Sequence, residues 1–245
     1  MDRRLETIAR LNYWNDNHFD NGLRRDLYLD RILPYIGNRV IKVVTGQRRA
    51  GKSWLLRQII TSMLSRHVVE PSQILYINKE FYRFNFLQTP DDLMDLFNVY
   101  CQEINPEAKS YVFLDEIHNI SGWERVVDSL SQDPSIDCEV FITGSNSKLL
   151  SGELSTLLSG RYVEFEVQPF SYLEFLKVYQ QEPSRQSMLE YLQSGGLPEF
   201  INLSGEETKR HYVESVKNTI LLKDIVERHN IKDAALLDRI FAYLV

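Results

Sequence analysis

The sequence predicts an α/β protein, in which a parallel five-stranded sheet is flanked by helices and a helical lid follows. Short β-rich runs alternate with longer helical patterns between residues 39 and 168. This alternation is typical of parallel strands joined by right-handed helical crossovers. The first four of these runs are continuously apolar, as expected of strands that are covered on both faces. After residue 168 only helical patterns follow.

Five runs are expected to form the strands of this sheet. They cover residues 40–44, 74–77, 111–114, 140–143 and 162–167. The last run, RYVEFEV, alternates apolar with acidic residues, which predicts an edge strand. Between the first two runs, apolar pairs recur every four residues in SWLLRQIITSMLSR, which predicts an amphipathic helix that begins at Ser53.

The helical and β-rich patterns divide the chain into four parts. An N-terminal helical segment is expected over residues 1–38, the sheet-containing core over 39–168 and the helical lid over 169–230. Residues 231–245 form a helical pattern that reaches the last residue without a capping signal. This pattern predicts the start of a truncated C-terminal domain.

Composition restricts the class of protein. Hydrophobic residues make up 43% of the 245 residues and charged residues 25%, as in ordinary globular proteins, and the net charge is −6. An acidic chain offers no general basic surface, so nucleic-acid binding stays open but without support. Cys101 and Cys138 have neither the spacing of a disulfide framework nor that of a zinc site. With no signal-peptide pattern and no apolar run long enough for a membrane span, we expect a cytoplasmic protein.

The most informative motif lies where the first strand meets the first core helix. Residues 46–53 read GQRRAGKS and fit the pattern G-x-x-x-x-G-K-[ST]. Glycines let backbone N–H groups close around phosphate oxygens, and the following helix points its positive end at them. Lys52 is expected to reach the β- and γ-phosphates of ATP, and the Ser53 hydroxyl to bind Mg²⁺. The alternative is a glycine-bounded turn with solvated cations.

All residues of this loop and the first turn of its helix are expected to contact the nucleotide. They are Gly46, Gln47, Arg48, Arg49, Ala50, Gly51, Lys52, Ser53 and Trp54. Of the two arginines, one is expected to point at solvent or to pack against the lid.

A pair of acids ends the third predicted strand. The run SYVFLDEIHNI places Asp115 and Glu116 directly after an apolar strand. A carboxylate at the tip of a buried strand beside the phosphate loop is expected to support Mg²⁺, directly or through water. Glu116 is then placed to polarise a water for in-line attack on the γ-phosphate. The alternative is a polar strand end that faces solvent.

Polar residues also follow two other strands. In VFITGSNSKLL, Asn146 is expected to lie between the attacking water and the γ-phosphate, and Ser145 is the second choice. Asn78, in LYINKE, is a weaker candidate that would hold Glu116 away from the water until a partner binds. An ordinary turn residue is the alternative for each of them.

Together these motifs resemble the AAA+/STAND class of ATPases. The resemblance is carried by four segments, which read TGQRRAGKS, YVFLDEIHNISGWE, FITGSNSKLLSGELSTLLSGR and SGGLPEF. They look like segments of bacterial and archaeal AAA-domain ATPases that carry a C-terminal domain of unknown function. The resemblance extends from about Arg25 to the end of the chain. It implies a P-loop NTPase fold with strand order 5-1-4-3-2, and ATP at the C-terminal ends of the first and fourth strands.

The resemblance gives a role to Arg161, in LSGRYVEF, which matches an arginine just before the fifth strand. In AAA+ rings such an arginine reaches the γ-phosphate of a neighbouring subunit, so the resemblance implies self-association through Arg161. The alternative is an arginine that pairs with Glu164 or Glu166.

The lid carries part of the family pattern. Gly195, Gly196 and Pro198 match a Gly-x-Pro signature in a segment that closes over the base or ribose, so Pro198 joins the expected nucleotide-binding residues. No clear second-sensor arginine follows, since Arg210 is available but unsupported. This departure favours a switch-like monomer or transient oligomer over ring-type sensing.

Two other nucleotide-dependent classes are rejected. A GTPase would read guanine with Asn-Lys-x-Asp, but Phe81 occupies the acid position and the segment precedes the Asp-Glu strand. The letters DEIH resemble a helicase box, but a helicase needs two tandem ATPase-like domains and this chain has room for one. His118 is therefore interpreted as a strand-exit residue.

The sequence thus predicts an ATP-binding protein in which Mg²⁺-dependent hydrolysis drives a conformational switch. The residues expected to act in catalysis are Lys52, Glu116, Asn146 and Arg161. The residues expected to hold the metal are Ser53 and Asp115. The alternative function is a nucleotide-dependent binding switch or scaffold with little or no hydrolysis. A protein partner is expected in either case, and the sequence does not identify it.

Overall fold

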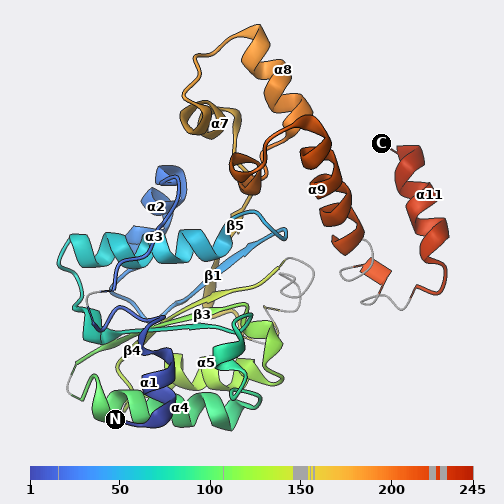
Figure 1. Cartoon of the computed structure of the whole chain (residues 1–245). Coiled ribbons are helices and arrows are strands. Elements are labelled where there is room, and N and C mark those ends of the chain that lie inside the picture. The colour runs from blue at the N-terminus through green and yellow to red at the C-terminus, as the bar shows by residue number, and fades with distance from the viewer. Residues whose placement is uncertain are drawn as a thin grey trace. The chain divides into compact units, whose positions relative to one another are not determined.

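The computed structural model describes the chain apart from residues 16, 107, 146–153, 155, 157, 221–224, 227–230 and 245. The chain forms two compact units (Figure 1). The first comprises Met1–Gly46, Lys52–Ser145 and Leu149–Val167. The second comprises Gln47–Gly51, Asn146–Lys148 and Gln168–Val245. The four-part division expected from the sequence stays a prediction.

A five-stranded sheet forms the centre of the first unit. Its strands are β1 Ile41–Gly46, β2 Ile74–Asn78, β3 Ser110–Asp115, β4 Cys138–Thr143 and β5 Tyr162–Val167. They are all parallel and lie in the order β2-β3-β4-β1-β5. The predicted sheet, its strand order and the edge position of the last strand are confirmed. The polar ends of β1, β3 and β4 therefore meet at one edge of the sheet.

Helices cover both faces of this sheet, as Figure 1 shows, with α2 and α3 on one face and α1, α4 and α5 on the other. Their bounds are α1 Arg3–Ala9, α2 Asp26–Ile32, α3 Lys52–Ser65, α4 Pro90–Glu103 and α5 Trp123–Gln132. Short 3₁₀ turns are η1 Leu33–Tyr35, η2 Pro71–Gln73, η3 Tyr82–Phe84 and η4 Ile117–Asn119. Helix α3 begins one residue earlier than the hydrophobic pattern predicts, so Lys52 itself belongs to its first turn.

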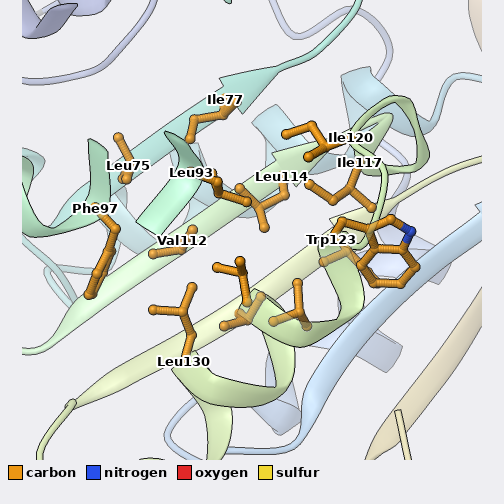
Figure 2. Close-up of a cluster of buried hydrophobic side chains, with 14 of the residues drawn as sticks. Leu75, Ile77, Leu93, Phe97, Val112, Leu114, Ile117, Ile120, Trp123 and Leu130 are labelled. Carbon is orange, nitrogen blue, oxygen red and sulfur yellow. The ribbon is translucent and has the colours of Figure 1, made fainter. Parts of the chain in front are cut away.

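An apolar cluster between the sheet, α4 and α5 fixes the strand that carries the acids (Figure 2). Leu114, the residue before Asp115, is fully buried, and Trp123 of α5 is 5% exposed. Ile117 and Ile120, which follow the acids, belong to the same cluster. Apolar packing on both sides of the acids therefore holds this part of the chain in place.

The segment after α1 covers the edge strand β2. The Asn12 side chain forms two hydrogen bonds with the backbone of Tyr76: its Nδ2 donates to the carbonyl at 3.0 Å, and its Oδ1 accepts from the N–H at 2.6 Å. The Trp14 indole donates to the carbonyl of Ile74 at 2.6 Å. These bonds satisfy backbone groups that an uncovered edge strand would expose to another chain.

We expect Asn12→Ala to lower the free energy of unfolding by about 1–3 kcal/mol, because it leaves the buried N–H of Tyr76 without its acceptor. Urea unfolding followed by circular dichroism measures this change. Asn98, exposed on α4, offers the matched control, and Asn98→Ala should change stability by less than about 0.5 kcal/mol. Equal stability of the two variants would show that Asn12 does not support the edge strand.

The second unit is helical. Its helices are α7 Tyr172–Tyr179, α8 Arg185–Ser194, η5 Pro198–Asn202, α9 Glu206–Thr219 and α11 Ala234–Leu244. Gly196 passes close to Phe170, since a Cβ on Gly196 would lie 2.1 Å from the Phe170 carbonyl oxygen. The Tyr191 hydroxyl donates to the same carbonyl at 3.0 Å. None of the helices described for this chain is long and apolar enough to cross a membrane.

Candidate nucleotide-binding site

The loop between β1 and α3 takes a backbone path that requires its glycines. Gly46 has φ +141°, and a Cβ on it would lie 2.2 Å from the Val167 carbonyl oxygen of β5. Gly51 has φ +95°, where a side chain is strained. Arg49 also has a positive φ, of +68°. The first glycine is thus needed for the packing of β1 against β5.

Lys52 is buried at the start of α3. The residue is 5% exposed, and its Nζ donates to the Gly46 carbonyl at 3.1 Å. The same Nζ lies 3.6 Å from Oε1 of Glu116. The lysine therefore lies between the end of β1, at Gly46, and the acid expected to act on water.

Asp115 is held by donors from both neighbouring strands, β2 and β4. Its Oδ2 accepts from the Tyr76 hydroxyl at 2.8 Å and from Nδ2 of Asn78 at 2.7 Å. Its Oδ1 accepts from the Thr143 hydroxyl. Burial and the Asp115 carboxylate both raise the pKa of the Tyr76 phenol, so this phenol keeps its proton and donates.

These bonds limit what else Asp115 can accept. A carboxylate has about four lone-pair sites, and the three bonds leave one of them, on Oδ1. The Ser53 hydroxyl, in the first turn of α3, is a second hard oxygen donor of the kind that Mg²⁺ prefers. Among the described residues there is no group of three or more His, Cys, Asp or Glu side chains that could hold a metal ion.

Glu116 has an unusual backbone and a buried side chain. Its φ is +53°, and its N–H donates to the Thr143 hydroxyl at 3.0 Å. The residue is 7% exposed. A cation or a potential donor lies against each carboxylate oxygen: Lys52 near Oε1, and Nδ1 of His118 at 3.3 Å from Oε2. The structure thus brings the predicted acid to the predicted lysine.

One expectation about this cluster is corrected. Asn78 holds Asp115 rather than Glu116, because its amide lies on the neighbouring strand at the register position of Asp115. His118 lies in the turn that leaves β3, as expected, and this turn brings its ring close to Glu116. Tyr76 and Thr143 were missed by sequence reasoning. A signal for Tyr76 existed, because it lies two residues before Asn78 and so shares its face of β2.

The predicted γ-phosphate residues have different outcomes. Asn146 lies outside the described residues. Its alternative, Ser145, is 1% exposed just after β4. Arg161 is half-exposed and pairs with Asp128 of α5 at 3.0 Å. Glu164, one of the two acids proposed as alternative partners, accepts from the Thr45 hydroxyl at 2.8 Å.

The other predicted nucleotide contacts are arranged as follows. Within the second unit, a Cβ on Gly51 would lie 3.8 Å from Cγ of Pro198. In the same unit the Arg49 guanidinium lies 5.7 Å from the centre of the Tyr212 ring, as expected for an arginine that packs against the lid. In the first unit, Trp54 is 40% exposed, and its ring lies 5.6 Å from the Arg57 guanidinium.

Gln47 and Ala50 form a turn within the loop between β1 and α3. The Ala50 N–H donates to the Gln47 carbonyl at 3.3 Å, and Ala50 is fully buried. Arg48 is half-buried.

Comparison with known proteins gives a consistent picture. Residues 38–176 of this chain match the sequence model of a protein family that is described as AAA domain. An uncharacterised protein of Haemophilus influenzae is 35% identical over 230 residues, which cover 91% of this chain and 55% of that protein. One from Methanocaldococcus jannaschii is 32% identical over 204 residues, which cover 79% of this chain and 43% of that protein. The chain thus spans about half the length of these two relatives.

A solved structure supports the fold alone. The Walker-type ATPase of Pyrococcus abyssi superposes with a TM-score of 0.55, at 14% identity, over 90% of this chain and 78% of that one.

Proposed function

Because this chain belongs to the AAA-domain family of P-loop ATPases, we propose that it binds ATP with Mg²⁺, hydrolyses it and uses hydrolysis to drive a conformational switch. The observation that carries the proposal is the pairing of Lys52 with Glu116 at 3.6 Å, with both residues buried. Phosphoryl transfer to water needs a cation that neutralises phosphate charge and a base that orients water. This pairing supplies both groups next to a glycine-bounded loop.

We assign phosphate binding to the loop and to the start of α3. Backbone N–H groups between Gly46 and Gly51 would surround the β- and γ-phosphates, with the helix N-terminus behind them. Lys52 would place its ammonium on the same oxygens. In the structure, the Lys52 ammonium donates to the Gly46 carbonyl at 3.1 Å. The side chain is therefore already close to the start of the loop, and it would have to move only a short way to reach ATP.

Ser53 and Asp115 would hold the Mg²⁺ ion. When bound, Mg²⁺ neutralises phosphate charge. The Ser53 hydroxyl is a direct ligand in this assignment. Asp115 has one lone pair left on Oδ1, so it accepts a single further contact, from the ion or from a water on it. Tyr76, Asn78 and Thr143 orient the carboxylate for that contact.

Glu116 would act as the general base. In the structure its carboxylate lies against Lys52, which ATP must draw to the phosphates. The charge of a triphosphate exceeds that of one carboxylate, so we expect Lys52 to move to ATP and to leave Oε1 of Glu116 for water. ATP binding would in this way prepare its own hydrolysis.

Asn146, Arg161 and Pro198 complete the proposal. Asn146 would sense the γ-phosphate from the end of β4, and Pro198 would contact the base or ribose. Arg161 would act in trans after leaving Asp128, a half-exposed pair of the kind that contributes little to stability and therefore costs little to break. We also propose the STAND-like subgroup with a C-terminal domain of unknown function, and an as yet unidentified protein partner for the switch.

A second function is favoured by one observation. Both oxygens of Glu116 already face protein groups, Lys52 and His118, so each oxygen has a protein group that competes with water for contact. If ATP did not break this arrangement, the chain would be a nucleotide-dependent binding switch or scaffold with little hydrolysis.

Steady-state hydrolysis and equilibrium binding, measured with Mg²⁺ and again with excess chelator, test the proposed function. We expect ATP turnover with Mg²⁺ and loss of turnover in excess chelator. Without the ion, the Asp115 carboxylate and the Ser53 hydroxyl supply no positive charge to neutralise the phosphates. Tight ATP binding without turnover in Mg²⁺ would favour the switch function. An absence of binding in both conditions would overturn the proposal.

A further inference from the structure

His118 lies against the one oxygen of Glu116 that Lys52 does not face. Its Nδ1 is 3.3 Å from Oε2, and its side chain is 10% exposed. Lys52 approaches the other oxygen, Oε1. The two contacts therefore divide the carboxylate between Lys52, which ATP is expected to move, and His118, which is outside the predicted phosphate-binding residues.

The backbone fixes His118 relative to Glu116. The turn η4 follows Glu116 directly, and the Glu116 carbonyl accepts from both the N–H and the side-chain amide of Asn119, each at 3.2 Å. Ile117, the first residue of this turn, and Ile120, the residue after it, are 1% and 0% exposed and point into the core (Figure 2). The imidazole is thus carried by a turn that is anchored on both sides.

The opposite end of Glu116 is anchored as well. Its N–H donates to the Thr143 hydroxyl at 3.0 Å, and this hydroxyl donates to Asp115. The backbone of Glu116 is therefore tied to the metal-supporting acid. What the backbone leaves undetermined is the direction of the carboxylate itself, since this side chain retains its own torsions.

We propose that His118 is a positioning residue for Glu116, a role that rests on the proposed function. When ATP draws Lys52 away, the contact from Nδ1 keeps Oε2 in place and so aims Oε1 at the attacking water. For this contact Nδ1 must carry a proton, as it does in the imidazolium and in one tautomer of the neutral ring. At 3.3 Å the Nδ1–Oε2 contact is close but is not aligned as a hydrogen bond. Contacts in sites without substrate are often long or poorly aligned and tighten when substrate binds.

The test compares His118→Ala and His118→Asn in the whole chain, by kcat for ATP hydrolysis and by ATP affinity. We expect His118→Ala to lower kcat about ten- to hundredfold, as loss of orientation does, and to leave affinity unchanged. His118→Asn places an amide N–H near the position of Nδ1 and should restore most of the activity. The control His18→Ala removes an exposed histidine and should have no effect.

A double-mutant cycle separates positioning from general damage. In a Glu116→Gln background, His118→Ala should lower residual turnover little further, because residues that act as a unit are not additive. An unchanged or raised kcat in His118→Ala would overturn the inference, as would an equal loss in both backgrounds. Failure of the proposed function looks different, since the wild-type chain itself would then lack turnover.

Discussion

Replacing Glu116 with glutamine is expected to lower kcat for ATP hydrolysis by about 10²- to 10⁴-fold, the usual contribution of a positioned general base. Glutamine has nearly the same shape, so the turn after β3 and its bond to Thr143 should persist. ATP binding should be retained or tightened, because the attraction between Lys52 and the Glu116 carboxylate no longer competes with phosphate. Phosphate release and equilibrium ATP binding measure the two effects.

Glu80→Gln is the matched control for this variant. Glu80 follows β2 at the same edge of the sheet, and it is exposed. We expect its kcat to stay close to that of the wild-type chain. A Glu116→Gln variant that turned over ATP as fast as the control would remove the base from the mechanism, even if the fold and the nucleotide site were right.

Replacing Lys52 with alanine is expected to weaken ATP binding by about 3 kcal/mol, or roughly 150-fold, within the range found when one partner of a buried charged hydrogen bond is removed. The effect should appear as a higher Kd for ATP in isothermal titration calorimetry. Hydrolysis should fall as well, since the same ammonium neutralises charge on the transferred phosphoryl group.

Lys109 provides a control with equal loss of charge. It lies next to the first residue of β3, far along the strand from Asp115, and pairs with Glu139 at 2.6 Å. Lys109→Ala should keep ATP affinity even where it lowers stability. If both lysine variants bound ATP like the wild-type chain, the loop between β1 and α3 would not be the phosphate site.

The sheet was predictable because four of its strands are buried on both faces and read as short apolar runs, while the edge strand β5 alternates apolar and acidic residues. The ends of the strands were less predictable. The structure extends β4 back to Cys138 and so includes Glu139, a fully buried acid that hydropathy alone does not place in a strand. Lys42 and Lys109 neutralise it at 2.9 and 2.6 Å, and this compensation between distant segments is invisible in a local pattern.

Candidate site residues were predictable where their position follows from the path of the backbone alone. The glycines and Lys52 follow from the loop, and Asp115 and Glu116 follow from the end of a strand. Side-chain direction was not predictable in the same way. Asn78 was expected to hold Glu116, but strand register places it opposite Asp115.

The role of His118 depends on a left-handed residue. Glu116 has φ +53°, and this turn brings His118 back over the acid. Glutamate in that conformation is uncommon, and the sequence carries no local signal for it. The partner of Arg161 was missed for a similar reason, since Asp128 is brought close by the packing of α5 rather than by its position in the sequence.

The most direct test of the central claim is to identify the nucleotide that stays bound after a single turnover. The wild-type chain and Glu116→Gln would each be mixed with substoichiometric ATP and Mg²⁺, and the bound nucleotide would be separated by chromatography. We predict ADP on the wild-type chain and intact ATP on Glu116→Gln. Intact ATP on both proteins would contradict an ATPase with Glu116 as its base and would favour the binding switch.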